Sequence, residues 1–179
     1  MPSGPPFPVK LARLAVAISI ALGMFAHVPG LAGADAGSPW SPGPNAVGDD
    51  TFTGFIDAPV AGSTVIRNSK VVVQGWVVDR TAQGWTGIDD VQVYLGLQGQ
   101  GGLLLSHAAI GLRRDDVAAA LGSGFWTGAG FSATFADNGL VSGSNTLTVY
   151  AHTPDRGWWY KQALSTAIPA GSVVPGVST

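Results

Sequence analysis

The fold of this chain is decided by two segments, residues 71–79 (VVVQGWVVD) and residues 87–95 (GIDDVQVYL). Both segments are dense in β-branched and aromatic residues, which favour strands. Polar or turn residues bound both of them, as is typical of strand ends. We therefore predict two β-strands, and their composition indicates a small β-sandwich.

The alternation of side chains assigns the two faces of these strands. In the second strand, Asp90, Gln92 and Tyr94 are expected to face outward. In the first, Gln74 indicates that the even-numbered side chains face outward, which would leave Trp76 partly exposed. If the strands lie in opposite sheets, two sets of side chains should meet in the core. They are Val71, Val73 and Val77 on one side, and Val91, Val93 and Leu95 on the other.

Five further strands and one short helix complete the predicted fold. The strands are expected at residues 52–57, 103–110, 131–135, 146–151 and 158–164. Residues 114–122 carry the one good local helix signal, with Asp115 as the N-cap and Gly122 as the terminator. Seven short strands separated by turns predict an all-β fold, an antiparallel seven-stranded sandwich.

Composition excludes several classes of chemistry. The chain has 179 residues, and it contains 26 Gly, 12 Pro and no Cys. Without Cys, it cannot form disulfides, cysteinyl zinc sites or a thiol nucleophile. All eleven acidic residues are Asp, and the absence of Glu weakens a helical interpretation. After residue 34, seven Lys and Arg face eleven Asp, a net charge of −4, which argues against a nucleic-acid partner.

The amino terminus has the pattern of a secretion signal. Lys10 and Arg13 precede an apolar run at residues 14–25, and small residues follow at 32–34. The run is shorter than the ~20 residues of a membrane span but fits a signal-peptide core. We expect cleavage between Ala34 and Asp35, so that the chain meets the membrane only through this segment during export. An uncleaved anchor helix is the alternative.

The domain organisation follows from these segments. We expect a signal peptide at residues 1–34, a Gly/Pro/Ser-rich linker at 35–52, a sandwich at 53–168 and a disordered tail at 169–179. Trp40 is unusual in such a linker; it either docks on the domain or, as we expect, is a solitary exposed aromatic. A secreted or cell-surface location follows if the signal functions.

Six segments together carry a family resemblance. They are residues 54–59 (GFIDAP), 73–79 (VQGWVVD), 87–94 (GIDDVQVY), 114–122 (RDDVAAALG), 130–134 (GFSAT) and 143–152 (GSNTLTVYAH). In this order and spacing, the chain resembles the bacterial immunoglobulin-like domains of secreted and surface proteins, over about residues 53–168. The resemblance implies an immunoglobulin-like sandwich that serves in adhesion, spacing or ligand binding. It implies no catalytic residues.

Motifs for catalysis and cofactor binding are weak. The chain has no G-x-S-x-G, and His107 and His152 fall in predicted strands, so we expect no enzyme. Residues 128–133 match a loose dinucleotide fingerprint but open a strand instead of a helix. Six aspartates sit at strand ends or turns, where carboxylates could bind calcium, but no contiguous calcium loop occurs. They are Asp57, Asp79, Asp89, Asp90, Asp115 and Asp116. We expect solvated turn aspartates, and therefore no metal or cofactor.

Aromatic residues are the better functional signal. Tyr94 and Tyr150 are expected on the outer face of neighbouring strands, and Trp158 and Trp159 on the next one; Trp85 and Trp126 are expected in loops. An exposed aromatic surface can stack on sugars or anchor a protein; alternatively, the rings fill the core.

These observations lead to two hypotheses about function. The first is a secreted, non-enzymatic immunoglobulin-like module for binding or adhesion at the cell surface or in the extracellular matrix. The alternative is a carbohydrate-binding module. The expected partner is an extracellular protein or a polysaccharide.

Overall fold

The computed structural model of the protein describes residues 39–66, 69–137 and 140–168. The predicted signal peptide, its cleavage site between Ala34 and Asp35, and the predicted tail lie outside these residues. Among the described residues, no helix is long and apolar enough to cross a membrane.

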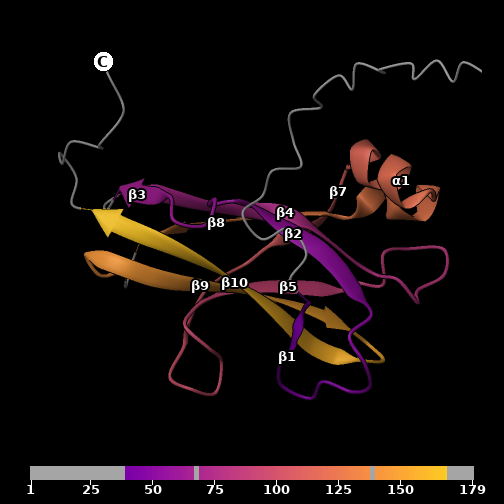
Figure 1. Ribbon diagram of the computed structural model, residues 1–179, viewed down its shortest axis with the longest axis horizontal. Coiled ribbons are helices and arrows are strands. Elements are labelled where there is room, and N and C mark those ends of the chain that lie inside the picture. The colour runs from indigo at the N-terminus through magenta and orange to yellow at the C-terminus, as the bar shows by residue number, and fades with distance from the viewer. Residues whose placement is uncertain (1–38, 67–68, 138–139, 169–179) are drawn as a thin grey trace, which may run out of the picture.

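Two β-sheets pack face to face (Figure 1). The first sheet has the order β1-β10-β9-β5-β6, with β3 also paired to β10, and the second has the order β2-β4-β8-β7. Strands of the first sheet are β1 (Ser41–Pro42), β3 (Thr64–Ile66), β5 (Asp90–Leu95), β6 (Leu103–His107), β9 (Gly143–Thr153) and β10 (Gly157–Ile168). Those of the second are β2 (Phe52–Ala58), β4 (Lys70–Asp79), β7 (Ala109–Leu112) and β8 (Gly130–Ala136). All pairs are antiparallel except β3 with β10.

The predicted all-β, two-sheet fold with one short helix is therefore confirmed, but the number of strands is not. In the described part of the chain there are ten strands instead of seven. The single strand expected at residues 103–110 is two strands, β6 and β7, which belong to different sheets. Ala108 marks the change of sheet, and its N–H donates to the carbonyl oxygen of Val91 at 2.8 Å. The short strands β1 and β3 were not expected.

The predicted pairing across the core is confirmed. β4 and β5 lie in opposite sheets, and their inward valines are almost completely inaccessible to solvent. Val71, Val73, Val77, Val91 and Val93 belong to one core cluster, and Leu95 packs against it. Because β4 and β5 contribute alternate residues to this cluster, the face assignment made from the sequence is correct.

The expected exposure of Trp76 is wrong. Trp76 does point to the outer face of its sheet, but only 4% of it is exposed. Helix α1 (Asp115–Leu121) and the 3₁₀ helix η1 (Gly124–Gly128) cover this face, with α1 drawn beside the β4 and β7 end of the sheet in Figure 1. Together they form a second apolar cluster of Trp76, Val78, Val117, Trp126 and Ala129. Trp76 is therefore buried without any reversal of the strand.

The C-terminal end of α1 agrees with the prediction, and its N-terminal end does not. Gly122 ends the helix in the left-handed conformation, with φ 72°, and its N–H bonds back to the helix. The predicted N-cap is wrong, because Arg114 holds that position and makes no side-chain capping bond. The Asp115 carboxylate instead accepts from Nε of Arg113 at 2.8 Å.

Residues 39–52, which the sequence assigns to a linker, lie against the sandwich. Trp40 is 3% exposed, and its ring centroid lies 5.8 Å from that of Phe52 in the core. Its backbone N–H donates to the Asp50 carboxylate at 2.7 Å, and β1 pairs with β10 beside it. The solitary exposed aromatic expected at this position is therefore wrong.

Candidate functional site

The six aromatic residues predicted to bind a ligand do not form one exposed surface. Four of them are buried: Trp126 (6% exposed), Trp159 (4%), Tyr94 (8%) and Tyr150 (1%). Trp158 is half-buried, and Trp85 is 45% exposed. The expected face of stacked, accessible rings is therefore wrong: Trp159 lies in the core between the sheets, and Trp126 packs in the second apolar cluster.

Tyr94 and Tyr150 lie side by side as predicted, but they are structural. Their ring centroids are 5.3 Å apart, and the Tyr160 ring lies 5.2 Å from that of Tyr150. The backbone N–H of Gln98 donates to the Tyr150 hydroxyl at 3.0 Å. This bond holds the loop that follows β5 against the Tyr150 ring. Burial raises the pKa of Tyr150. This hydroxyl therefore serves the fold and not a ligand.

The remaining tryptophans have different surroundings. Trp159 packs on Phe52 in the core, with centroids 5.8 Å apart, and its indole N–H donates to the carbonyl oxygen of Arg156 at 3.1 Å. Trp158 lies 4.7 Å from the ring of His152. His152 in turn contacts the Asp89 carboxylate at 2.6 Å. Trp159 is therefore buried in the core, whereas Trp158 is half-buried beside His152.

Trp85 lines a pocket at one end of the sandwich. The pocket has a volume of about 260 Å³ and lies between the β4–β5 loop and the β9–β10 turn. Its lining residues are Asp79, Thr81, Ala82, Gln83, Trp85, Gly87, Thr153, Pro154, Asp155 and Arg156. We refer to it as the loop-end pocket. Trp85 is thus a predicted binding residue that is exposed and lines a cavity.

Asp79 holds the base of the loop-end pocket together. Although it ends strand β4, it is 5% exposed. Its Oδ1 accepts three hydrogen bonds, from the Thr51 hydroxyl at 2.8 Å and from the N–H and hydroxyl of Thr81 at 2.9 and 2.7 Å. Its Oδ2 lies 3.5 Å from Nε of Arg156. One carboxylate thus joins three chain segments, as a buried charge requires.

The β4–β5 loop folds tightly over this carboxylate because of a glycine. Gly87 has φ 81°, a left-handed conformation that side chains rarely adopt. A Cβ atom at this position would lie 2.7 Å from Cβ of Asp79 and 2.8 Å from Cβ of Ala82. The N–H of Asp79 also donates to the carbonyl oxygen of Thr86 at 2.8 Å. The loop is therefore fixed in place before any ligand arrives.

The outer part of the pocket carries groups that remain available. Within the described ranges, the side chains of Gln83 and Asp155 form no hydrogen bond with the rest of the protein. Gln83, Trp85 and Asp155 are all exposed. The loop-end pocket thus combines a rigid ionic base with an exposed indole, an amide and a carboxylate. This combination suits binding.

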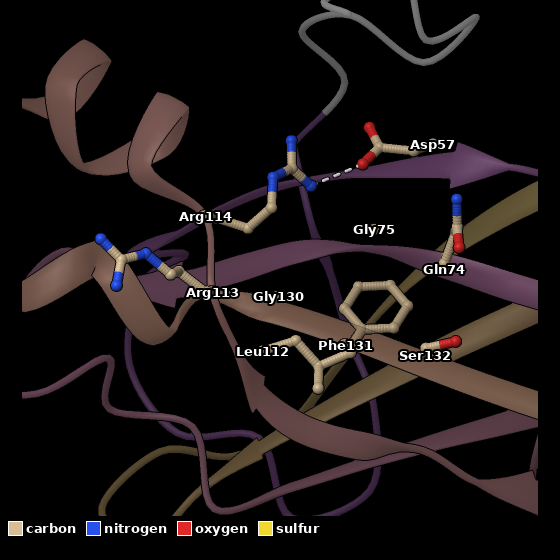
Figure 2. Close-up of a pocket in the computed structure, with 9 residues that line it drawn as sticks. All are labelled: Asp57, Gln74, Gly75, Leu112, Arg113, Arg114, Gly130, Phe131 and Ser132. Carbon is tan, nitrogen blue, oxygen red and sulfur yellow. Dashed lines mark hydrogen bonds and ion pairs between the residues drawn. The ribbon is translucent and has the colours of Figure 1, made fainter.

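A second pocket, of about 330 Å³, lies on the outer face of the β2-β4-β8-β7 sheet (Figure 2). In Figure 2, Arg114 points toward Asp57 and Arg113 turns away. The Arg114 guanidinium is 2.6 Å from Asp57 and makes a two-point contact with Asp116 at 2.8 and 2.9 Å. The hydrogen bonds from Arg114 hold the pKa of Asp116 below its usual value, and the same pair raises the pKa of Arg114. Because these charges satisfy one another, we assign this pocket a structural role.

The other aspartates considered for calcium also have partners inside the protein. Asp90 lies 3.3 Å from His107 and accepts from the Gln92 amide at 2.8 Å. Asp57 and Asp116 both bind Arg114. In the part of the chain that the structure describes, no three His or Asp side chains come together in a way that could hold a metal ion.

Sequence reasoning found only part of this site. It singled out Trp85 as a loop residue. It missed the roles of Asp79, Thr81 and Arg156. The turn-forming residues of the β4–β5 loop and of the β9–β10 turn could have marked these two segments as candidate binding loops. That the two loops share one end of the molecule follows only from the strand order.

Comparison with known proteins gives little further information. No protein-family model matches the chain, and no curated protein matches it. Among solved structures, the chain is similar to an endo-β-1,4-mannanase from Thermotoga petrophila, with 9% sequence identity and a TM-score of 0.41. The similarity covers 69% of this chain and 20% of the mannanase chain, so the chain spans about a fifth of that protein. This similarity is too weak to support any inference about the chain.

Proposed function

We propose that this protein is a non-catalytic immunoglobulin-like binding module that acts outside the cytoplasm, at the cell surface or in the extracellular matrix. The observation that carries the proposal is the loop-end pocket, in which a rigid scaffold presents an exposed tryptophan between two loops. Binding residues are often placed on loops that a rigid sandwich holds in position.

The strand order supports the immunoglobulin-like assignment. In immunoglobulin domains one sheet has the strand order A-B-E-D, and the other contains G, F and C. The orders β2-β4-β8-β7 and β10-β9-β5 correspond to these. On this assignment, the β4–β5 loop is the B–C loop and the β9–β10 turn is the F–G loop. These two loops carry recognition residues in variable domains.

The expected location rests on the amino-terminal sequence. A basic flank, a short apolar core and a small-residue cleavage site are the parts of a secretion signal. An extracellular module without cysteine relies on its apolar core for stability, and the two clusters described above provide such a core.

Binding of the labelled protein to intact cells and to extracellular matrix tests this proposal. We expect Trp85→Ala to reduce binding about tenfold or more, because aromatic anchors at binding sites carry a large share of the affinity. Phe125→Ala is the matched control, since Phe125 is 48% exposed, lies in η1 and does not line the pocket. Equal binding by both variants would contradict the assignment of the loop end.

A further inference from the structure

We infer that the loop-end pocket binds a neutral sugar unit of a polysaccharide. The inference rests on the proposed function and specifies the class of ligand. Three features of the pocket carry it: its size, the nature of its exposed groups and its charge.

The size of the loop-end pocket suits a single ring. Its volume of about 260 Å³ lies just below the ~300–1,000 Å³ that is usual for pockets that enclose drug-sized ligands. A protein partner would instead need an interface of roughly 800 Å² on each side, with several buried anchors. Trp85 is the one large exposed apolar side chain, among those described, that lines the pocket. A compact ligand with one apolar face therefore fits better than a protein surface.

The exposed groups of the pocket match the chemistry of a sugar ring. One face of a pyranose carries C–H groups and can stack on an indole, while its hydroxyls both donate and accept hydrogen bonds. Trp85 offers the apolar surface. The Gln83 amide can donate and accept, and the Asp155 carboxylate accepts from hydroxyls. Since the base is already fixed by Asp79, little ordering accompanies binding.

The charge of the pocket selects against acidic sugars. Its charged lining residues are Asp79, Asp155 and Arg156, which give a net charge of −1. Arg156 lies against Asp79, so the base is internally compensated. Asp155 is left as the exposed charge. A uronate or sulfated sugar would meet this carboxylate at short range, where like charges repel. Neutral sugars avoid this repulsion.

The test uses affinity electrophoresis and calorimetry, because neither method needs the Trp85 indole as a signal when Trp85 is replaced. The probes are neutral oligosaccharides (cello-, xylo-, malto- and chitin oligomers) and acidic ones (alginate and galacturonate oligomers). We expect the wild-type protein to bind at least one neutral series more tightly than the acidic ones. Trp85→Ala should weaken this binding about tenfold or more, with Trp85→Phe intermediate because it keeps a ring. Phe125→Ala should bind like the wild type.

Asp155→Asn provides a readout that a purely structural role would not change. It removes the exposed charge but keeps an oxygen acceptor, so the preference for neutral over acidic oligosaccharides should narrow several-fold. If the wild-type protein bound neither the neutral nor the acidic oligosaccharides but still bound cells through Trp85, the sugar assignment would be overturned. The proposed function would then stand, with a protein as the ligand. Oligosaccharide binding that is unchanged in Trp85→Ala would also overturn the sugar assignment. Absence of both oligosaccharide and cell binding would refute the proposed function as well.

Discussion

Asp79 is the residue on which the shape of the loop-end pocket depends. Its carboxylate receives three hydrogen bonds and faces Arg156 while it is almost fully buried. Asp79→Ala would leave the Thr51 and Thr81 donors without their acceptor and Arg156 without its counter-ion. We expect a loss of about 1–3 kcal/mol in the free energy of unfolding, because these hydrogen bonds to a charged acceptor are lost, although the exposed Thr81 can bond to water instead. Urea denaturation measures it.

Asp155→Asn is the matched control for this substitution. Asp155 is exposed and lies in the same pocket. Surface substitutions of this kind usually change stability by less than about 0.5 kcal/mol. If Asp79→Ala were as stable as Asp155→Asn, the carboxylate of Asp79 would not be organising the loops.

At the scale of elements, α1 and η1 pack against the outer face of the second sheet and bury part of it. Trp126 in η1 and Val117 in α1 cover Trp76. Trp126→Ala should destabilise the protein by about 3–5 kcal/mol, the usual cost of removing a buried tryptophan. It should also make Trp76 accessible to quenching by iodide.

The neighbouring residue in η1 supplies the comparison for that prediction. Phe125→Ala removes a ring of the same helix that is 48% exposed, and we expect it to cost less than about 1 kcal/mol. Similar losses in the two variants, or an unquenched Trp76, would mean that η1 does not stabilise the sheet beneath it.

The elements also show what local sequence can predict. Alternation located β4, β5, β8 and β9, because the apolar side chains that face the core recur at every second position of these strands. The division of residues 103–110 into β6 and β7 was invisible, since Ala108 resembles any strand residue and the change of sheet is a tertiary event. The burial of Trp76 depends on Val117 and Trp126, about 40 and 50 residues further along the chain. For the same reason the sequence could identify Trp85 but not its pocket.

At the scale of the whole molecule, the segment before β2 belongs to the fold. Trp40 fills the margin between the sheets, where it lies 5.8 Å from Phe52, and Nζ of Lys161 lies 5.9 Å from its ring. Gly43 extends the attachment, since its N–H donates to the carbonyl oxygen of Trp158 at 2.9 Å. We expect Trp40→Ala to cost about 3–5 kcal/mol. That is a large share of the roughly 5–15 kcal/mol that stabilises a typical domain.

Under the proposed export of this protein, this attachment limits where a signal peptide could be removed. Cleavage between Ala34 and Asp35 would leave residues 35–39 ahead of Trp40, so the exported protein would keep its anchor. Cleavage beyond Trp40 would remove an indole that the core needs. We therefore expect mass spectrometry of the exported protein to find Asp35 as its first residue. A mature chain that begins after Trp40 and is as stable as the wild type would contradict the structural role of Trp40. Urea denaturation of the Trp40→Ala protein in parallel shows whether loss of the indole alone lowers the stability.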